Sequence, residues 1–327
     1  MHKSSEILIH IGYMKCASTY VQTNIFQKLH DQGKINYIRP YQTKELRKLF
    51  DYLRQTDPFN YDAEMVELQF KMVIKSGKNV ISAEGLTGDL FYKNWNSKFI
   101  ADRLHQLFPE ARILIKIRNQ YNLVRSLYGH FIREGGSLSF QEFAKFREEQ
   151  FIPIDQRNSI WDHTVNMDTF KYSNLINYYA IKFGESNVTV LPMEYIFSKQ
   201  NAYLAKVSQF LGFEFDLGEI STKKVHPGYA KNQIYFARFL NRMFVSHHNR
   251  YPLLGIFKKE FQSHGFFHYH RFSRKLLSLK ILSKLLGNKK LHDPILEQKM
   301  KEYFTDSNKQ LEFYHDLNLS FENGSYY

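Results

Sequence analysis

The sequence contains only one cysteine among 327 residues, so no disulfide can form within the chain. This is typical of proteins of reducing compartments, and we expect a cytoplasmic protein. The sequence also lacks any run of about 18 uninterrupted apolar residues, which argues against a transmembrane helix. Its first residues enter a strand-like pattern without the hydrophobic region of a secretory signal. The length and the 43% hydrophobic content suffice for one large α/β domain spanning residues 1–327.

Acidic residues are nearly absent from one part of the chain. Between residues 223 and 290 there are 15 lysines and arginines against one acid, Glu260, a charge of 15 − 1 = +14. The whole chain carries +13, so the remainder is close to neutral. Such a one-sided field implies an anionic partner. We expect a helical, basic subregion at about 223–290 and peripheral contact with the inner, anionic face of a membrane. No nucleic-acid-binding module is recognisable, so we expect no nucleic acid partner.

Strand-like and helical patterns alternate along the chain. Short apolar runs predict strands at 7–11, 80–83, 111–117 and 187–192. Helical spacing predicts helices at 18–26, 99–108, 123–133, 172–183, 199–211 and 294–311. Strands that alternate with helices indicate a parallel sheet with right-handed crossovers. The predicted fold is therefore α/β, with three layers and a central parallel sheet.

Two segments have less regular patterns. A capping pair, Ser139 and Glu142, predicts a further helix over 137–150. Residues 30–76 are polar and mixed, and we interpret them as an insertion over the first loop. One helix is expected in it, from the helical spacing of Met65, Leu68, Met72 and Val73.

The stretch Ile7–Phe26 combines a strand, a tight turn and a helix that opens with Ser18-Thr19. The first N–H groups of a helix and the positive end of its dipole attract anions. Lys15 in the turn adds a full positive charge. This pattern predicts a binding site for a phosphate or sulfate group.

The turn departs from the Walker A form, in which Gly-Lys directly precedes Ser or Thr. It resembles instead the 5′-phosphosulfate loop of sulfotransferases that use 3′-phosphoadenosine-5′-phosphosulfate (PAPS), in particular the bacterial, carbohydrate-type family. That loop is roughly K-x-G-(S/T)-(S/T) after a strand. Ala17 stands where the family usually has glycine, and Met14 where it often has proline. The resemblance implies a P-loop NTPase-like fold. It also implies that the 5′-phosphosulfate is held by Lys15, Cys16, Ala17, Ser18, Thr19 and Tyr20.

A second motif has the spacing found in the same family. There, a strand ends in an arginine and a serine follows eight residues later on the next helix, and both hold the 3′-phosphate of PAPS. Arg118 ends the run ILIKI, and Ser126 lies eight residues further on. Asn119-Gln120 replaces the usual Asp-Pro. Arginine suits phosphate because it is always charged and presents a fork of donors. A helix cap or a surface ion pair is the alternative role for Arg118.

Glu84 follows the strand-like run VISA. In carbohydrate-type sulfotransferases a glutamate at this point is the general base for the acceptor hydroxyl. A carboxylate beyond the carboxyl end of a parallel strand faces the same crevice as a phosphate loop there. The resemblance therefore implies Glu84 as base and Lys15 as the group that neutralises the leaving oxygen. A helix cap or an ion pair is the alternative for Glu84. His130 and His10 are rival bases, although the place of His10 within a strand favours packing in the core.

Weaker indications complete the prediction. The segment Lys223–Asn232 resembles the basic loop that closes over the nucleotide in the family, which makes Lys224 a further phosphate ligand or part of a solvated loop. Cys16 is interpreted as a small loop residue rather than a reactive thiol. No metal is expected, since the scattered histidines lack accompanying carboxylates or cysteines.

The predicted reaction moves a sulfuryl group from PAPS to a hydroxyl of a carbohydrate or glycolipid, leaving PAP. The alternatives are an ATP-dependent P-loop kinase and a basic glycan- or membrane-binding protein with an inactive nucleotide fold.

Overall fold

The computed structural model divides into two compact units, which are described separately. The first consists of Met1–Gln120, Asp168–Lys223 and Tyr303–Tyr327, and the second of Tyr121–Met167 and Lys224–Glu302. The prediction of one domain over the whole chain stays a prediction. The structure describes residues 5–90, 96–152, 164–216, 229–243, 253, 286–287, 289–315, 317–321 and 325–327.

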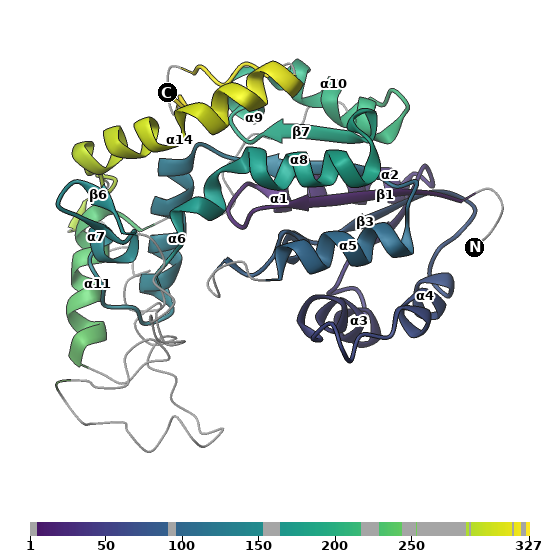
Figure 1. The fold of residues 1–327 in the computed structure, drawn as a ribbon, viewed down its shortest axis with the longest axis horizontal. Coiled ribbons are helices and arrows are strands. Elements are labelled where there is room, and N and C mark those ends of the chain that lie inside the picture. Colours follow the sequence, from purple (N-terminus) through teal and green to yellow (C-terminus); the bar gives the residue numbers. More distant parts are fainter. Residues whose placement is uncertain are drawn as a thin grey trace. The chain divides into compact units, whose positions relative to one another are not determined.

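The first unit is built on a five-stranded sheet (Figure 1). Its strands lie in the order β2-β3-β1-β4-β7, and every neighbouring pair is parallel. The chain order reverses at β1, which has β3 on one side and β4 on the other. Ligands of such open sheets bind beyond the carboxyl ends of the strands, at the point of reversal. The strands are β1 (Ser5–Gly12), β2 (Asn36–Ile38), β3 (Gly77–Ser82), β4 (Arg112–Ile117) and β7 (Val188–Pro192).

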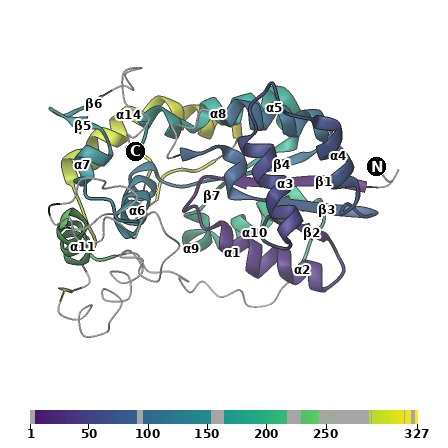
Figure 2. The same cartoon turned by 90° about the horizontal axis from the view of Figure 1, so that it is seen from below.

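Helices of the first unit cover both faces of this sheet (Figure 2). On one face lie α5 (Ser97–Leu107) and α8 (Tyr172–Phe183). On the other lie α1 (Ser18–Val21), α2 (Gln27–Asp31), α9 (Tyr195–Ser198) and α10 (Gln200–Leu211). Strands covered on both faces become continuous apolar runs, which is why they stand out in the sequence. The predicted three-layer α/β fold with a central parallel sheet is confirmed.

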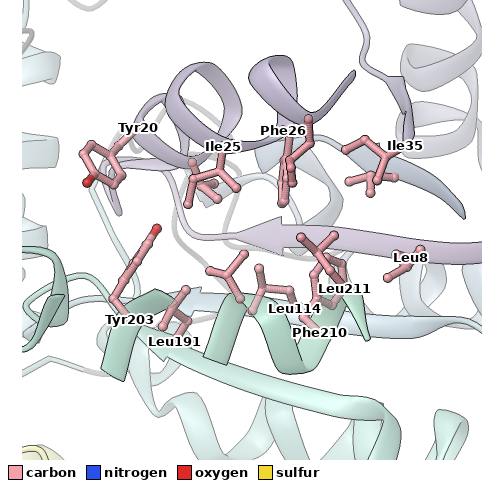
Figure 3. Packing of buried hydrophobic residues seen from close by; sticks show 14 of the residues in the cluster. Leu8, Tyr20, Ile25, Phe26, Ile35, Leu114, Leu191, Tyr203, Phe210 and Leu211 are labelled. Carbon is pink, nitrogen blue, oxygen red and sulfur yellow. The ribbon is translucent and has the colours of Figure 1, made fainter. Parts of the chain in front are cut away.

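A cluster of buried side chains attaches the helices of the second face to the sheet (Figure 3). Leu8, Leu114 and Leu191 come from β1, β4 and β7, and they pack with Phe26 and Phe210 from the helical layer. Each fully buried side chain of this size contributes about 1.5–3 kcal/mol. The cluster therefore anchors the helical segment that follows β1, and with it the loop between them.

The helix predicted over 18–26 is longer than expected. A π-helical turn at Gln22–Phe26 joins α1 to α2, so helical backbone continues from Ser18 to Asp31. Single π turns of this kind often lie beside functional sites.

The interpretation of residues 30–76 was incomplete. The segment supplies β2, an edge strand of the main sheet, and two helices, α3 (Lys44–Gln55) and α4 (Ala63–Lys71). The buried face of α4 was also misjudged, because Leu68 and Met72 are 61% and 84% exposed while Val66 and Phe70 are buried. A three-residue strand is too short to show a period in the sequence.

The second unit contains the predicted helix α6 (Gln120–Arg133, whose first residue lies in the first unit) and α11 (Lys231–Met243). The long helix α14 (Pro294–His315) begins in this unit and ends in the first. Asn241 of α11 donates two hydrogen bonds, to the carbonyls of Ile132 and Gly136. Apart from α11, most of the basic subregion 223–290 lies outside the described residues. None of the described helices has the length and apolar character needed to cross a bilayer.

The helix predicted over 137–150 is wrong in its extent. Its start is as expected, because Ser139 and Glu142 form a reciprocal capping box. However, α7 (Phe140–Phe143) ends after four residues, and the chain turns back as a hairpin of β5 (Phe146–Arg147) and β6 (Gln150–Phe151). The two turn residues, Glu148 and Glu149, have φ of 51° and 58°. Glutamate rarely adopts this conformation, so the turn has no sequence signature.

Short 3-10 turns elsewhere span Glu84–Thr87, Met167–Phe170 and Glu185–Asn187.

Candidate active site

The loop between β1 and α1 leaves the sheet at its carboxyl edge and contains two residues with left-handed backbone. Lys15 has φ 68°, and Ala17 has φ 57° and ψ 38°. This conformation costs a non-glycine residue about 1–2 kcal/mol, so the surrounding contacts must impose it. It explains why glycine suits position 17, and alanine holds the same left-handed conformation here.

Contacts from β4 and from the 3-10 turn after β3 fix the start of this loop. The Tyr13 N–H donates to the Lys116 carbonyl on β4 at 3.3 Å. The Thr87 hydroxyl lies 3.2 Å from the Gly12 carbonyl and 2.9 Å from that of Glu84. Gly12 allows β1 and β4 to approach closely, because a Cβ there would lie 2.8 Å from the Lys116 Cβ. The end of β1 is therefore held from both sides.

Arg118 lies at the end of β4 and reaches the loop. Its Nη1 donates to the Lys15 carbonyl at 2.8 Å. The Tyr172 hydroxyl donates to the Arg118 carbonyl at 2.6 Å, and the next residue, Asn119, donates its N–H to Glu194 at 3.0 Å. Arg118 and Lys15 belong to two motifs that lie about 100 residues apart in the sequence. The structure brings the two motifs into direct contact.

Glu84 follows β3 and is the first residue of a 3-10 turn at the same edge of the sheet. Its partial burial raises the pKa of the carboxyl, while the nearby charges of Lys15 and Lys116 and the Ser18 hydroxyl lower it in part. The Ser18 hydroxyl is buried and has no hydrogen bond of good geometry to any described residue. A carboxylate with a raised pKa beside a lysine is suited to accept a proton near neutral pH.

The other predicted loop residues differ in their surroundings. Cys16 is fully buried, and burial raises the pKa of its thiol, which supports its role as a small loop residue. Thr19 is exposed. Tyr20 is buried, and its ring meets the Tyr203 ring edge-on at 5.9 Å (Figure 3). Tyr20 therefore packs as a core residue, and its role as a ligand of the phosphosulfate stays a prediction.

His10 is packed in the core, as its place in the strand predicted. It is fully buried, and its Nδ1 lies 2.7 Å from the Ser82 hydroxyl. Burial, with the charge of Lys116, holds its pKa well below the usual range for histidine. It is therefore a poor candidate for the base.

Two charged residues near the loop were missed. Lys116 is fully buried within β4, and the sequence signal for it was a single lysine inside the apolar run ILIKI. Glu194 lies just before α9, and it accepts hydrogen bonds from the Asn119 N–H and, at 3.1 Å, from the Tyr326 hydroxyl. Burial raises its pKa. No local pattern marks Glu194, because its partners come from distant parts of the chain.

The remaining predicted site residues are not brought to the loop by the first unit. Ser126 and the rival base His130 lie on α6 in the second unit, and Lys224 lies outside the described residues. Their roles stay predictions. Within the described ranges, no group of three or more His, Cys, Asp or Glu could hold a metal ion.

Comparisons with known proteins bear on the fold. No protein-family model and no curated protein matches the sequence. A solved structure, the sulfotransferase from Alicyclobacillus acidocaldarius, aligns over 95% of this chain and 96% of its own, with a TM-score of 0.50 and 16% identity. The chain has the fold of a sulfotransferase. The sulfotransferase domain from the curacin biosynthetic pathway covers 68% of this chain and 81% of its own, with 14% identity. Its TM-score is 0.32, which is too low to support a conclusion about the fold.

Proposed function

We propose that this protein transfers the sulfuryl group of PAPS to an acceptor hydroxyl and releases PAP. The observation that carries the proposal is the meeting of three predicted residues at the carboxyl edge of the sheet. Arg118 Nη1 contacts the Lys15 carbonyl at 2.8 Å, and the charge of Lys15 acts on the pKa of Glu84. The loop therefore contains the cation of Lys15, and the guanidinium of Arg118 and the carboxylate of Glu84 lie beside it.

In this proposal the loop holds the 5′-phosphosulfate of the donor. Lys15 and the backbone N–H groups of residues 17–19 face the anion, and the side chains of Ser18 and Thr19 add hydroxyl donors. The N–H groups of Cys16 and Tyr20 instead donate to the carbonyls of Tyr13 and Ala17. Arg118 holds the 3′-phosphate, for which a permanently charged fork of donors is suited. The assignment of Ser126 and Lys224 to the same phosphate rests on the sequence resemblance alone.

The proposed chemistry needs no covalent enzyme intermediate and no metal. The acceptor oxygen forms a bond to sulfur while the bond from sulfur to the 5′-phosphate oxygen breaks. Glu84 takes the proton of the acceptor hydroxyl, and Lys15 neutralises the charge that develops on the departing phosphate oxygen. Preorganised charge of this kind supplies most of the rate in many transfer reactions.

The proposed acceptor is a hydroxyl of a carbohydrate or a glycolipid at the inner face of a membrane, reached from the cytoplasm. The support is the charge of the segment 223–290, with 15 basic residues against one acid. A small phenol or alcohol would gain nothing from such a field, whereas a large anionic acceptor would be attracted to it.

Calorimetric titration with PAP and with ADP–Mg²⁺ tests the donor. We expect PAP to bind more tightly, and Arg118→Ala to weaken it by about 10- to 100-fold, the value of one or two hydrogen bonds to a charged group. Arg112→Ala is the matched control, because Arg112 lies at the opposite end of the same strand and pairs with Glu6. It should leave PAP affinity unchanged.

The same titrations distinguish the alternatives. Preference for ADP–Mg²⁺ would indicate a kinase, and no binding of either nucleotide would indicate a glycan- or membrane-binding protein. Unchanged PAP affinity in Arg118→Ala would remove Arg118 from the site.

A further inference from the structure

Lys116 is a charged residue in the middle of the sheet. It lies in β4, between β1 and β7, and its side chain is 0% exposed. A buried ammonium is costly unless hydrogen bonds and opposite charges satisfy it. An apolar residue could occupy this strand position without that cost. The role of the charge must therefore be sought in the groups that the Lys116 ammonium contacts.

The ammonium is directed at the loop. Lys116 Nζ donates to the Ala17 carbonyl at 2.8 Å and to the Tyr203 hydroxyl at 3.2 Å. Ala17 is the residue with φ 57° and ψ 38° that ends the loop. The same carbonyl accepts the Tyr20 N–H at 3.0 Å, so Lys116 supplies a second, charged donor to the strained residue. This hydrogen bond helps to offset the strain.

This contact also sets the direction of the next N–H group. In a trans peptide the carbonyl and the following N–H point in opposite directions. With the Ala17 carbonyl turned toward Lys116, the Ser18 N–H points away from it. That is the N–H at the start of the helical segment, where the proposed anion is held.

The charged surroundings come from every element around the ammonium. His10 lies on β1, Cys16 on the loop, Glu84 after β3, Glu194 before α9 and Tyr203 on α10. Burial lowers the pKa of Lys116 to about 8, while Cys16, Glu84 and Glu194 act to raise it. Lys116 is thus mostly protonated at pH 7 and titrates just above it.

We propose that Lys116 is a positioning residue for the anion-binding loop: it pins the Ala17 carbonyl so that the Ser18 N–H faces the anion, and it adds a buried positive charge beneath that anion. That the anion is the phosphosulfate of PAPS rests on the proposed function. That Lys116 positions the loop is independent of the proposed function.

Hydrogen exchange of the ligand-free protein tests the positioning directly. In Lys116→Met, whose unbranched apolar side chain is one atom shorter and carries no charge, we expect the amides of residues 13–20 to exchange at least tenfold faster. Some loss of overall stability is expected as well, because Lys116 no longer donates to Ala17 and Tyr203, so the faster exchange must be confined to the loop and not extend to the amides of β1. Tyr203→Phe is the matched control, since it removes the second acceptor and keeps the contact to Ala17. Equal loop exchange in Lys116→Met and the wild type would overturn the proposal.

Binding of PAP gives a second test. We expect Lys116→Met to bind PAP at least tenfold more weakly at pH 7. Wild-type affinity should fall roughly tenfold from pH 7 to pH 9, because about a tenth of a group with a pKa of about 8 is protonated at pH 9. The variant should lose this dependence. The wild-type pH series needs no substitution, so it also covers the case in which the variant does not fold.

The outcomes separate the two proposals. If the wild type binds PAP with no change between pH 7 and 9, and Lys116→Met binds it equally well, the role of Lys116 is refuted and the donor assignment stands. If the wild type does not bind PAP, the donor assignment fails, and loop exchange in the variant still decides the role of Lys116.

Discussion

Replacing Gly12 with alanine tests the close approach of β1 and β4 that supports the loop. Gly12 is paired with Lys116 in the parallel ladder. A Cβ at Gly12 would lie 2.8 Å from the Lys116 Cβ, 3.2 Å from its carbonyl oxygen and 3.3 Å from its nitrogen. Two of these three atoms belong to the backbone, and the third is fixed to it. No change of side-chain rotamer can therefore relieve the contact.

The size of the effect follows from these distances. Carbon atoms pack favourably at about 3.5 Å or more, so the strands must separate by about 0.7 Å (3.5 − 2.8). The hydrogen bond from the Tyr13 N–H to the Lys116 carbonyl is already 3.3 Å long, and the shift would break it. Overpacking costs about 1–3 kcal/mol and a lost hydrogen bond about 1 kcal/mol. We expect Gly12→Ala to lower the free energy of unfolding by about 2–4 kcal/mol.

Urea unfolding followed by circular dichroism measures this change. With a denaturant slope of about 3 kcal/mol/M, the midpoint should fall by about 1 M. Two further glycines provide controls for the same added methyl group. Gly33 has open space around it but φ +71°, so Gly33→Ala should cost about 1 kcal/mol from backbone strain alone. Gly129 lies within α6, where an added Cβ would meet no atom outside the helix's own backbone within 4 Å, so Gly129→Ala should gain about 0.5–1 kcal/mol.

The comparison can refute the reasoning. If Gly12→Ala costs no more than Gly33→Ala, the sheet absorbs the methyl group, and the close strand approach does not constrain the loop. PAP affinity should fall in Gly12→Ala and stay unchanged in Gly33→Ala, because only Gly12 adjoins the loop.

Three further predictions concern Glu84 and the acceptor. Glu84→Gln should lower the transfer rate about 100-fold or more with PAP affinity retained, and surviving activity would point to another base such as His130. Because burial raises the pKa of Glu84, the stability linked to its protonated form is lost as pH rises through that pKa. Glu84→Gln should therefore melt no lower than the wild type at pH 7, and a lower melting temperature would contradict the assignment. In a screen of acceptors, anionic glycans and glycolipids should outperform small phenols and alcohols at low salt and lose this advantage at high salt. A salt-independent preference for a small acceptor would refute the role given to the basic segment.

Local patterns in the sequence determined much of the framework. The strands β1, β3, β4 and β7 were predictable because burial on both faces leaves a continuous apolar run. The loop with Lys15 was visible because a strand, a tight turn and a helix start follow each other within 20 residues. Arg118 and Glu84 were candidates because the resemblance to the sulfotransferase family implies their roles, and each lies just beyond the carboxyl end of such a strand.

Only the tertiary structure decided what surrounds the loop. Lys116 donates to the loop from β4, and Glu194, just before α9, accepts the N–H of Asn119, the residue after Arg118. A lysine within an apolar run marks Lys116 as unusual, but neither residue has a local pattern that gives its partners. The edge strand β2 was missed because three residues carry no period, and the hairpin after α7 because glutamates occupy its left-handed turn. Periodicity reports which face of an element is buried, whereas the contacts that hold Ala17 in its strained conformation join residues about 100 positions apart. Such contacts exist only once the sheet has formed.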